Sequence, residues 1–243
     1  MAAWLNPRRF QSARKCYLQL SCQHRHQLHT SNCNAQKMYE LRTYSIQPAE
    51  FGNFLKLTQE QFHLRTAHSK LLGYWTSELG GLNQVVHIWE YDTFQHRTNV
   101  RKALADDPQW ISNYISIMMK KLVQQDNVVM FPLPWYPIQS SNQQGGVYEL
   151  QSISSSASKY SNLETNVKKT VSSQNNDSSK LIGIWKTEHG PLDTMFLLWR
   201  FNDLDERHNI KKNSKDSIAE LDHPSVISRT SKILVPVQFS PLK

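Results

Sequence analysis

The chain has 243 residues, with 39% hydrophobic and 20% charged side chains, which is the composition of an ordinary globular protein. Its formal net charge of +8 is unevenly distributed, because residues 1–37 hold six of the 28 basic residues and none of the 20 acidic ones. The rest of the chain is close to neutral and lacks the basic surface that a nucleic-acid-binding domain needs. No stretch approaches the roughly 18 consecutive apolar residues of a membrane-spanning helix.

Residues 1–37 have the composition of a mitochondrial presequence. They are basic, free of acids and rich in Gln, Ser and His, and a helix would place Phe10, Ala13, Tyr17 and Leu20 on one face. A secretory signal is excluded, because no apolar stretch of about 7 to 15 residues follows the first basic residues. We therefore expect a mitochondrial targeting leader and a protein in the matrix or on a mitochondrial membrane, with the cytosol as the alternative.

All three cysteines lie in this leader, so no disulfide framework holds the rest of the chain, which fits a reducing compartment. An alternative is a zinc site formed by these cysteines and the histidines between them, but their spacing matches no familiar zinc template. The residues concerned are Cys16, Cys22, His24, His26, His29 and Cys33. We expect neither a metal nor another cofactor.

The first half of the remaining chain, residues 38–134, reads as strand, helix, strand, strand, helix and strand. The strands are predicted at Met38–Ile46, Lys70–Leu79, Asn83–Asp92 and Asn127–Leu133 from alternation and β-forming residues. The first helix is predicted to begin at Pro48. After a short helix from Thr93 to Leu104, Asp106-Asp107-Pro108 signals a long helix with an apolar stripe from Trp110 to Leu122.

The second half, residues 146–243, repeats this order after a polar linker at residues 135–145. Strands are predicted at Val147–Ser152, Lys180–Glu188, Asp193–Phe201 and Ile233–Phe239, and a helix at Lys159–Ser172. Asp222-His223-Pro224 predicts a further helix that lasts only to about Ser231. The second half therefore looks eroded relative to the first.

The two halves are related by an internal repeat with an offset of 109 or 110 residues. Gly73, Trp75, Trp89 and Arg97 return as Gly183, Trp185, Trp199 and Arg207, and Tyr39-Glu40-Leu41 returns as Tyr148-Glu149-Leu150. Each copy is long enough to own a core, unlike a solenoid repeat. The expected fold is α+β, with two tandem ferredoxin-like βαββαβ modules packed face to face as a dimeric α/β-barrel-type arrangement.

Several segments resemble the NIPSNAP family, strongly in the first half and weakly in the second. They are Tyr39–Tyr44 (YELRTY), His63–His68 (HLRTAH), Leu71–Trp75 (LLGYW), Glu78–Asp92, His96–Trp110 and the terminal Phe239–Lys243 (FSPLK). The pattern departs from the family where Val226 stands in place of the tryptophan expected after the second Asp-x-Pro.

This resemblance implies a mitochondrial α/β barrel without established catalytic activity. It further implies a non-catalytic adaptor, linked to mitochondrial quality control through autophagy adaptors and to vesicular trafficking. The partners expected from it are proteins rather than nucleic acid, with peripheral association with a mitochondrial membrane and homo-oligomerisation as further expectations.

The alternative function is an oxygenase-like barrel that binds a small molecule or haem. Alternation places His87 and Trp89 on one strand face and Glu40 and Arg42 on one face of the first strand, so a cavity inside the barrel would be lined by Glu40, Arg42, Trp75, His87 and Trp89. Against this, His87 and Arg42 correspond to Leu197 and Gln151 in the second copy. We therefore expect no catalytic residue, and an open cavity at His87 and Trp89 would favour the alternative.

A basic cluster on the predicted helix after Thr93 forms a candidate partner surface. It consists of Arg97, Arg101 and Lys102, which could contact an acidic protein or a lipid headgroup. A solvated helix face is the competing interpretation.

Overall fold

The computed structural model describes residues 36–140, 145–174, 179–213 and 225–243. Residues 1–35 of the predicted targeting leader, with its cysteines and histidines, residues 141–144 of the linker, and Asp222-His223-Pro224 lie outside these residues. The described part forms a mixed α/β fold built on a closed barrel with eight antiparallel strands.

The first half contains four strands with helices between them. β1 (Met38–Ile46) is followed by a 3₁₀ turn (Pro48–Glu50) and α1 (Phe51–Thr66), then by β2 (Lys70–Leu79), β3 (Gln84–Tyr91) and α2 (Phe94–Ala105). Four short helical segments run on to β4 (Leu122–Pro132), namely α3 (Pro108–Trp110), a π-helical turn (Ile111–Ile115), α4 (Ser116–Met118) and a 3₁₀ turn (Met119–Lys121). Thr93 and Asp107 cap α2 and α3 as the sequence predicts.

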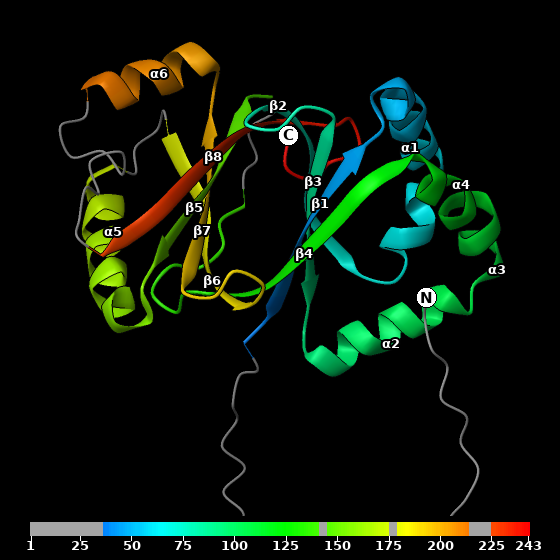
Figure 1. The fold of residues 1–243 in the computed structure, drawn as a ribbon, viewed down its shortest axis with the longest axis horizontal. Helices are drawn as coiled ribbons and strands as arrows, with labels where there is room; N and C mark the ends of the chain where they lie inside the picture. The colour runs from blue at the N-terminus through cyan, green and yellow to red at the C-terminus, as the bar shows by residue number, and fades with distance from the viewer. Residues whose placement is uncertain (1–35, 141–144, 175–178, 214–224) are drawn as a thin grey trace, which may run out of the picture. The chain divides into compact units, whose positions relative to one another are not determined.

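The second half has the same order of strands and helices. β5 (Val147–Ser155) leads through a 3₁₀ turn (Ala157–Lys159) into α5 (Tyr160–Gln174), followed by β6 (Ser179–His189), β7 (Thr194–Phe201), α6 (Leu204–Asn213) and β8 (Val226–Pro236). Figure 1 shows α1 to α4 outside the strands of the first half, and α5 and α6 outside those of the second.

The strand order around the barrel is β1-β3-β2-β8-β5-β7-β6-β4. The two halves meet edge to edge, because β2 pairs with β8 and β4 pairs with β6. The two sheets pack face to face as expected, and in addition backbone hydrogen bonds join them along both edges to close the barrel. Closure leaves no unpaired strand edge.

The barrel interior is filled by apolar side chains from both halves. They form one buried cluster: Tyr39, Leu41, Trp75, Val86, Ile88, Met130, Tyr148, Leu150, Ile182, Trp185, Phe196, Leu198, Leu234 and Leu242. The opposite faces of the strands are buried as well, in one cluster under the helices of each half. β3 and β7 are therefore covered on both faces and are almost wholly buried.

The repeated Gly-x-Trp sequence has a steric explanation. Gly73 and Trp75 lie on the same side of β2, and a Cβ on Gly73 would come within 2.2 Å of the Trp75 ring. Gly183 and Trp185 repeat this contact, with the corresponding distance at 2.5 Å. Each indole therefore packs over a glycine, beside a register shift with the neighbouring strand.

A buried ion pair fastens one helix of each half to the sheet. The Glu40 carboxylate of β1 is fully buried and accepts hydrogen bonds from Arg97 of α2 at 2.8 and 3.1 Å. Glu149 of β5 accepts bonds from Arg207 of α6 at 2.6 and 2.9 Å. The glutamate and the arginine occur in separate segments of the sequence repeat, and in each half they bind each other in the folded protein.

The structure corrects two predicted boundaries. β4 begins at Leu122 rather than Asn127, because this polar stretch pairs with β1. The short helix predicted to end near Ser231 is wrong over its described part, since residues 226–231 open β8 and pair with β5 from Ser155 to Gln151. Backbone pairing in the closed barrel overrides the local start signal. The sequence analysis also missed α6.

Replacing Gly73 by Ala should destabilise the fold by about 1–3 kcal/mol, the usual cost of adding a carbon to a packed core. Urea unfolding measures the change. Gly52→Ala is the matched control, because nothing lies within 4 Å of its added Cβ in α1, and it should leave the free energy of unfolding unchanged or raise it by up to about 1 kcal/mol. Equal effects of the two substitutions would contradict the steric explanation.

Candidate functional site

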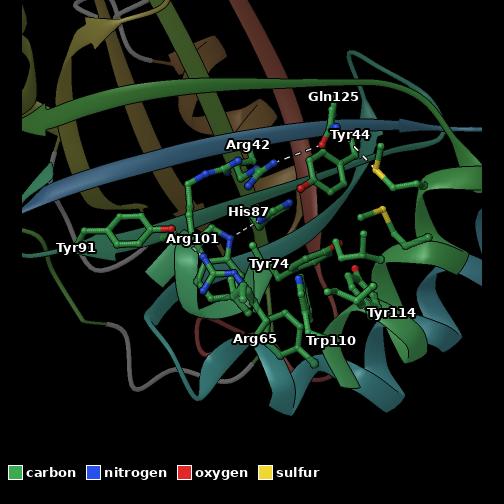
Figure 2. A pocket seen from close by; sticks show the side chains of 18 residues that line it. Arg42, Tyr44, Arg65, Tyr74, His87, Tyr91, Arg101, Trp110, Tyr114 and Gln125 are labelled. Carbon is green, nitrogen blue, oxygen red and sulfur yellow. Dashed lines mark hydrogen bonds between the residues drawn. The ribbon is translucent and has the colours of Figure 1, made fainter. Parts of the chain in front are cut away.

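A cavity of about 310 Å³ lies between the outer face of the first-half strands and the helices that cover them. It is not inside the barrel, whose interior is filled. The walls come from β1 to β4, α1, α2 and the helical segments from α3 onward, and the lining residues are Arg42, Tyr44, Phe62, Arg65, Tyr74, His87, Trp89, Tyr91, Arg101, Leu104, Ala105, Trp110, Ile111, Tyr114, Ile115, Met118, Met119 and Gln125. Figure 2 shows these side chains from close by.

Aromatic rings enclose His87 at the base of the cavity. Tyr74 of β2 stacks on the imidazole with ring centroids 4.7 Å apart and planes 7° from parallel. Tyr44 of β1 meets it edge-on at 4.9 Å. The side chains are in position because His87, Tyr74 and Tyr44 occupy neighbouring positions on adjacent strands, with Arg42 paired to His87 in register.

The hydrogen bond from Trp89 fixes the tautomer of His87. The indole Nε1–H donates to His87 Nδ1 at 2.6 Å, so Nδ1 is the acceptor and the ring proton is on Nε2. His87 Nε2 is buried and has no hydrogen-bond partner in the described part of the chain. The ring therefore keeps an N–H donor that no described residue accepts.

His87 is held neutral. Burial lowers its pKa well below the usual value, and the positive charges of Arg42 and Arg65 lower it further. A histidine in this state does not accept a proton near neutral pH, and its Nδ1 is already occupied by Trp89. General-base catalysis by His87 is accordingly disfavoured.

Arg65 of α1 is a fixed buried cation at the side of the cavity. Its guanidinium lies 3.9 Å from the Trp89 ring centroid and donates to the Tyr91 hydroxyl at 2.8 Å, and it also bonds to Ser69. Stacking and hydrogen bonds hold the group in one place. Tyr91 in turn donates to Glu40 at 3.4 Å, which links the cavity wall to the buried ion pair.

Arg42 of β1 and Arg101 of α2 add two further positive charges. Arg42 donates to the Gln125 amide oxygen at 3.4 Å, one of the dashed bonds in Figure 2, while its buried Nε has no partner among the described residues. Arg101 is exposed at the helix surface and lines the cavity. Burial raises the pKa of the Tyr44 hydroxyl, and the positive charges of Arg42 and Arg101 lower it in part. Both arginines are therefore near enough to Tyr44 to act on its charge.

The structure brings together three of the five residues predicted to line a cavity, namely Arg42, His87 and Trp89. Trp75 faces the barrel interior instead. Glu40 lies on the same face of β1 as Arg42 but does not line the cavity, and Arg97 and Asn127 bind its carboxylate.

The three cations of the predicted partner surface have different environments. Arg97 forms an ion pair with Glu40, and Arg101 lines the cavity. Lys102 is exposed, and it neither pairs with Glu40 nor lines the cavity. They do not form one free basic surface.

Sequence reasoning missed most of the residues that give the cavity its character. Arg65, Tyr74 and Trp110 were assigned to a helix, a strand and a core stripe, with no sign that they share one space. One available signal was asymmetry between the copies, since Tyr74 corresponds to Ile184 and Tyr44 to Ile153.

The second half holds a different hollow at the corresponding place. It has a volume of about 270 Å³, and the described residues that line it include neither an aromatic ring nor a histidine: Gln151, Ile153, Lys211, Arg229, Thr230 and Ser231. Leu197 stands in place of His87, and the buried Trp199 indole N–H has no hydrogen-bond partner among the residues that the structure describes. The second copy keeps the tryptophan and has lost its acceptor.

Within the described residues there is no group of three or more His, Cys, Asp or Glu side chains arranged to hold a metal ion. In the same part of the chain, no helix is long and apolar enough to cross a membrane.

Replacing His87 by Gln should remove a component of the acid sensitivity of folding. Below pH about 6.5 the unfolded chain binds a proton at His87 that the folded protein does not, so stability falls as pH falls. From pH 7.5 to 5 the wild type should lose about 2 kcal/mol relative to the variant, as measured by urea unfolding at both pH values. A constant difference between the two proteins would show that His87 is not held neutral.

The comparisons with known proteins agree with this architecture. The NIPSNAP family model matches residues 39–137 and again residues 148–241. Human Protein NipSnap homolog 3A is 34% identical over 212 residues, covering 84% of this chain and 85% of the relative. Mouse Protein NipSnap homolog 3B is 35% identical, with the same coverage.

Solved structures share the fold at low identity. A monooxygenase candidate from Fusobacterium nucleatum has a TM-score of 0.65 at 10% identity, covering 84% of this chain and 94% of that one. An anthrone oxidase-like protein has a TM-score of 0.57 at 7% identity, covering 86% and 94%. These two likenesses concern the fold alone. Because the family model matches both halves and the curated relatives align over most of their length, the chain belongs to the NIPSNAP family.

Proposed function

We propose that this NIPSNAP-family chain binds a small organic molecule in the cavity of its first half. The observation that carries the proposal is that the space around His87 and Trp89 is hollow, although aromatic rings and arginines surround it. An adaptor that uses only its outer surface has no need for a cavity there. The volume lies at the small end of the range for ligand pockets, about 300–1,000 Å³.

Binding without conversion fits the chemistry of the wall. His87 is neutral, its Nδ1 is occupied, and the described residues that line the cavity include no carboxylate and no cysteine. The site offers hydrogen-bond donors and aromatic faces, which are tools of recognition. We therefore propose a binding protein rather than an enzyme.

We further propose that the chain is organised as two ferredoxin-like modules, at residues 38–134 and 146–243, joined by a linker at 135–145. The repeated order of strands and helices supports this division. The first module then carries the ligand site, and the second serves mainly to close the barrel.

The adaptor role implied by the family resemblance is our second proposal, with partners in mitochondrial quality control or vesicular trafficking. One surface feature supports it: the hairpin turns of the two halves expose the corresponding leucines Leu82 and Leu192, at 76% and 65%. Exposed apolar side chains at matching turns suit contact with another protein. Mitochondrial residence, read from residues 1–37, belongs to the same proposal.

Filling the cavity should abolish ligand binding. A ligand present at about 100 times its Kd stabilises the folded protein by about 2.7 kcal/mol, and Ala105→Phe should remove this stabilisation because Ala105 lines the cavity. Native mass spectrometry of the full chain isolated from its own cells identifies the bound mass, and thermal unfolding measures its effect.

Ala103→Phe is the matched control, since Ala103 is exposed on the same helix and does not line the cavity. It should retain the ligand. A wild-type protein without any bound mass, or a ligand retained by the Ala105 variant, would count against the proposal.

Deleting residues 1–37 should abolish mitochondrial localisation in cells, because the presequence-like composition is confined to that segment. Fluorescence microscopy of the full and shortened chains measures this. Unchanged localisation would show that the address lies elsewhere.

Crosslinking in the same cells tests the adaptor role, for which the full chain should capture quality-control or trafficking proteins.

A further inference from the structure

The cavity wall is positively charged and this charge is not balanced by any residue that lines it. Arg42, Arg65 and Arg101 contribute three guanidinium groups, and none of the described lining residues is acidic. Within the described chain these three arginines form no ion pair. The nearby Glu40 carboxylate interacts electrostatically with Arg42 and Arg65, but its own ion pair is with Arg97, which offsets its charge. The potential inside the cavity therefore favours a negative ligand.

Two buried N–H donors in the same wall have no acceptor among the described residues. Arg42 Nε and His87 Nε2 are both buried and unpartnered, and the bond from Trp89 requires the proton of His87 to be on Nε2. Leaving buried N–H groups unpaired is unfavourable, and a ligand oxygen that enters between the two groups would relieve it. Figure 2 shows Arg42 and His87 on neighbouring strands, where the two residues are paired in register.

The part of the wall formed by the helical segments after α2 has the opposite character. Trp110 and Tyr114 pack with ring centroids 4.7 Å apart, and Leu104 and Met118 lie beside them in the lining. This side suits a flat apolar body rather than a hydrated ion. Cationic groups at one side and aromatic faces at the other require a ligand with two different ends.

We propose that the cavity takes an aromatic carboxylate, with its carboxylate bound by Arg42 and His87 and its ring system against Trp110 and Tyr114. The inference rests on the proposed function, because it names the ligand class for that same site. A planar carboxylate matches the planar guanidinium of Arg42, which can donate two parallel hydrogen bonds. The neutral His87 adds a donor without accepting the ligand's proton.

The test compares two ligands that differ in charge. Isothermal titration of the full chain with naphthalene-2-carboxylate and with naphthalene-2-carboxamide should show at least about tenfold tighter binding of the carboxylate, since charge-assisted hydrogen bonds are about twice as strong as neutral ones. Arg42→Met should weaken carboxylate binding by about tenfold or more and change carboxamide binding little. Acetate, which lacks the ring system, should bind far more weakly than the naphthalene carboxylate.

Lys102→Met is the charge-matched control, because Lys102 is exposed on α2 and does not line the cavity. It should leave both affinities unchanged. Arg42→Lys keeps the charge without the planar fork, and an intermediate affinity is expected; this variant replaces Arg42→Met if that protein does not fold.

Equal binding of the two naphthalene compounds, or undiminished carboxylate binding by Arg42→Met, would overturn the anion assignment and leave the proposed small-molecule function standing. Acetate binding as tight as that of naphthalene-2-carboxylate would overturn the aromatic half of the assignment. If neither naphthalene compound binds, the ligand class is wrong, and the bound mass compared between the Ala105 and Ala103 variants decides the proposed function separately.

Discussion

The buried carboxylate on the first strand of each half is the constraint on which the helices depend. Glu149 is fully buried, and although burial alone would raise its pKa, bonds from Arg207, Lys211 and Ser231 bring it to about 2. Glu40 is held in the same way by Arg97 and Asn127, and its pKa is likewise lowered. A buried charge without its partner is strongly destabilising, so each helix has only one acceptable position on the sheet.

This ion pair also places the site. Arg97 is on α2 one turn before Arg101, so anchoring Arg97 to Glu40 sets Arg101 and Leu104 over the outer face of β1 and β3. In the second half the corresponding residue to Arg101 is Lys211, which turns to Glu149 and joins the ion pair. The same scaffold therefore leaves a cation for a ligand in one half and uses it internally in the other.

The fold was largely predictable from the sequence, whereas the location of the site was not. The repeat and the alternation of apolar residues predict four strands in each half. They succeed because Gly73, Trp75 and Glu40 make the same contacts as Gly183, Trp185 and Glu149 in the second half. Alternation shows which residues share a strand face, but not which face is inside. Because both faces of β3 are buried, alternation alone does not show which face lines the barrel interior. The His87 face was predicted to line it, but this face lies under the helices. Cavity residues such as Arg65 come from a helix whose docking no local pattern reveals.

The internal repeat separates structural residues from functional ones. Glu40 and Glu149, like Trp75 and Trp185, are present in both copies and hold the fold together. Loss of His87 in the second copy first argued against a role for it, because a catalytic pair would be expected in both halves. The geometry reverses that argument. Trp199 has kept its indole where Leu197 replaces the histidine, and its buried N–H has no partner among the described residues. His87 thus satisfies the Trp89 donor in the first half, and its place in the cavity wall is consistent with the proposed binding role as well.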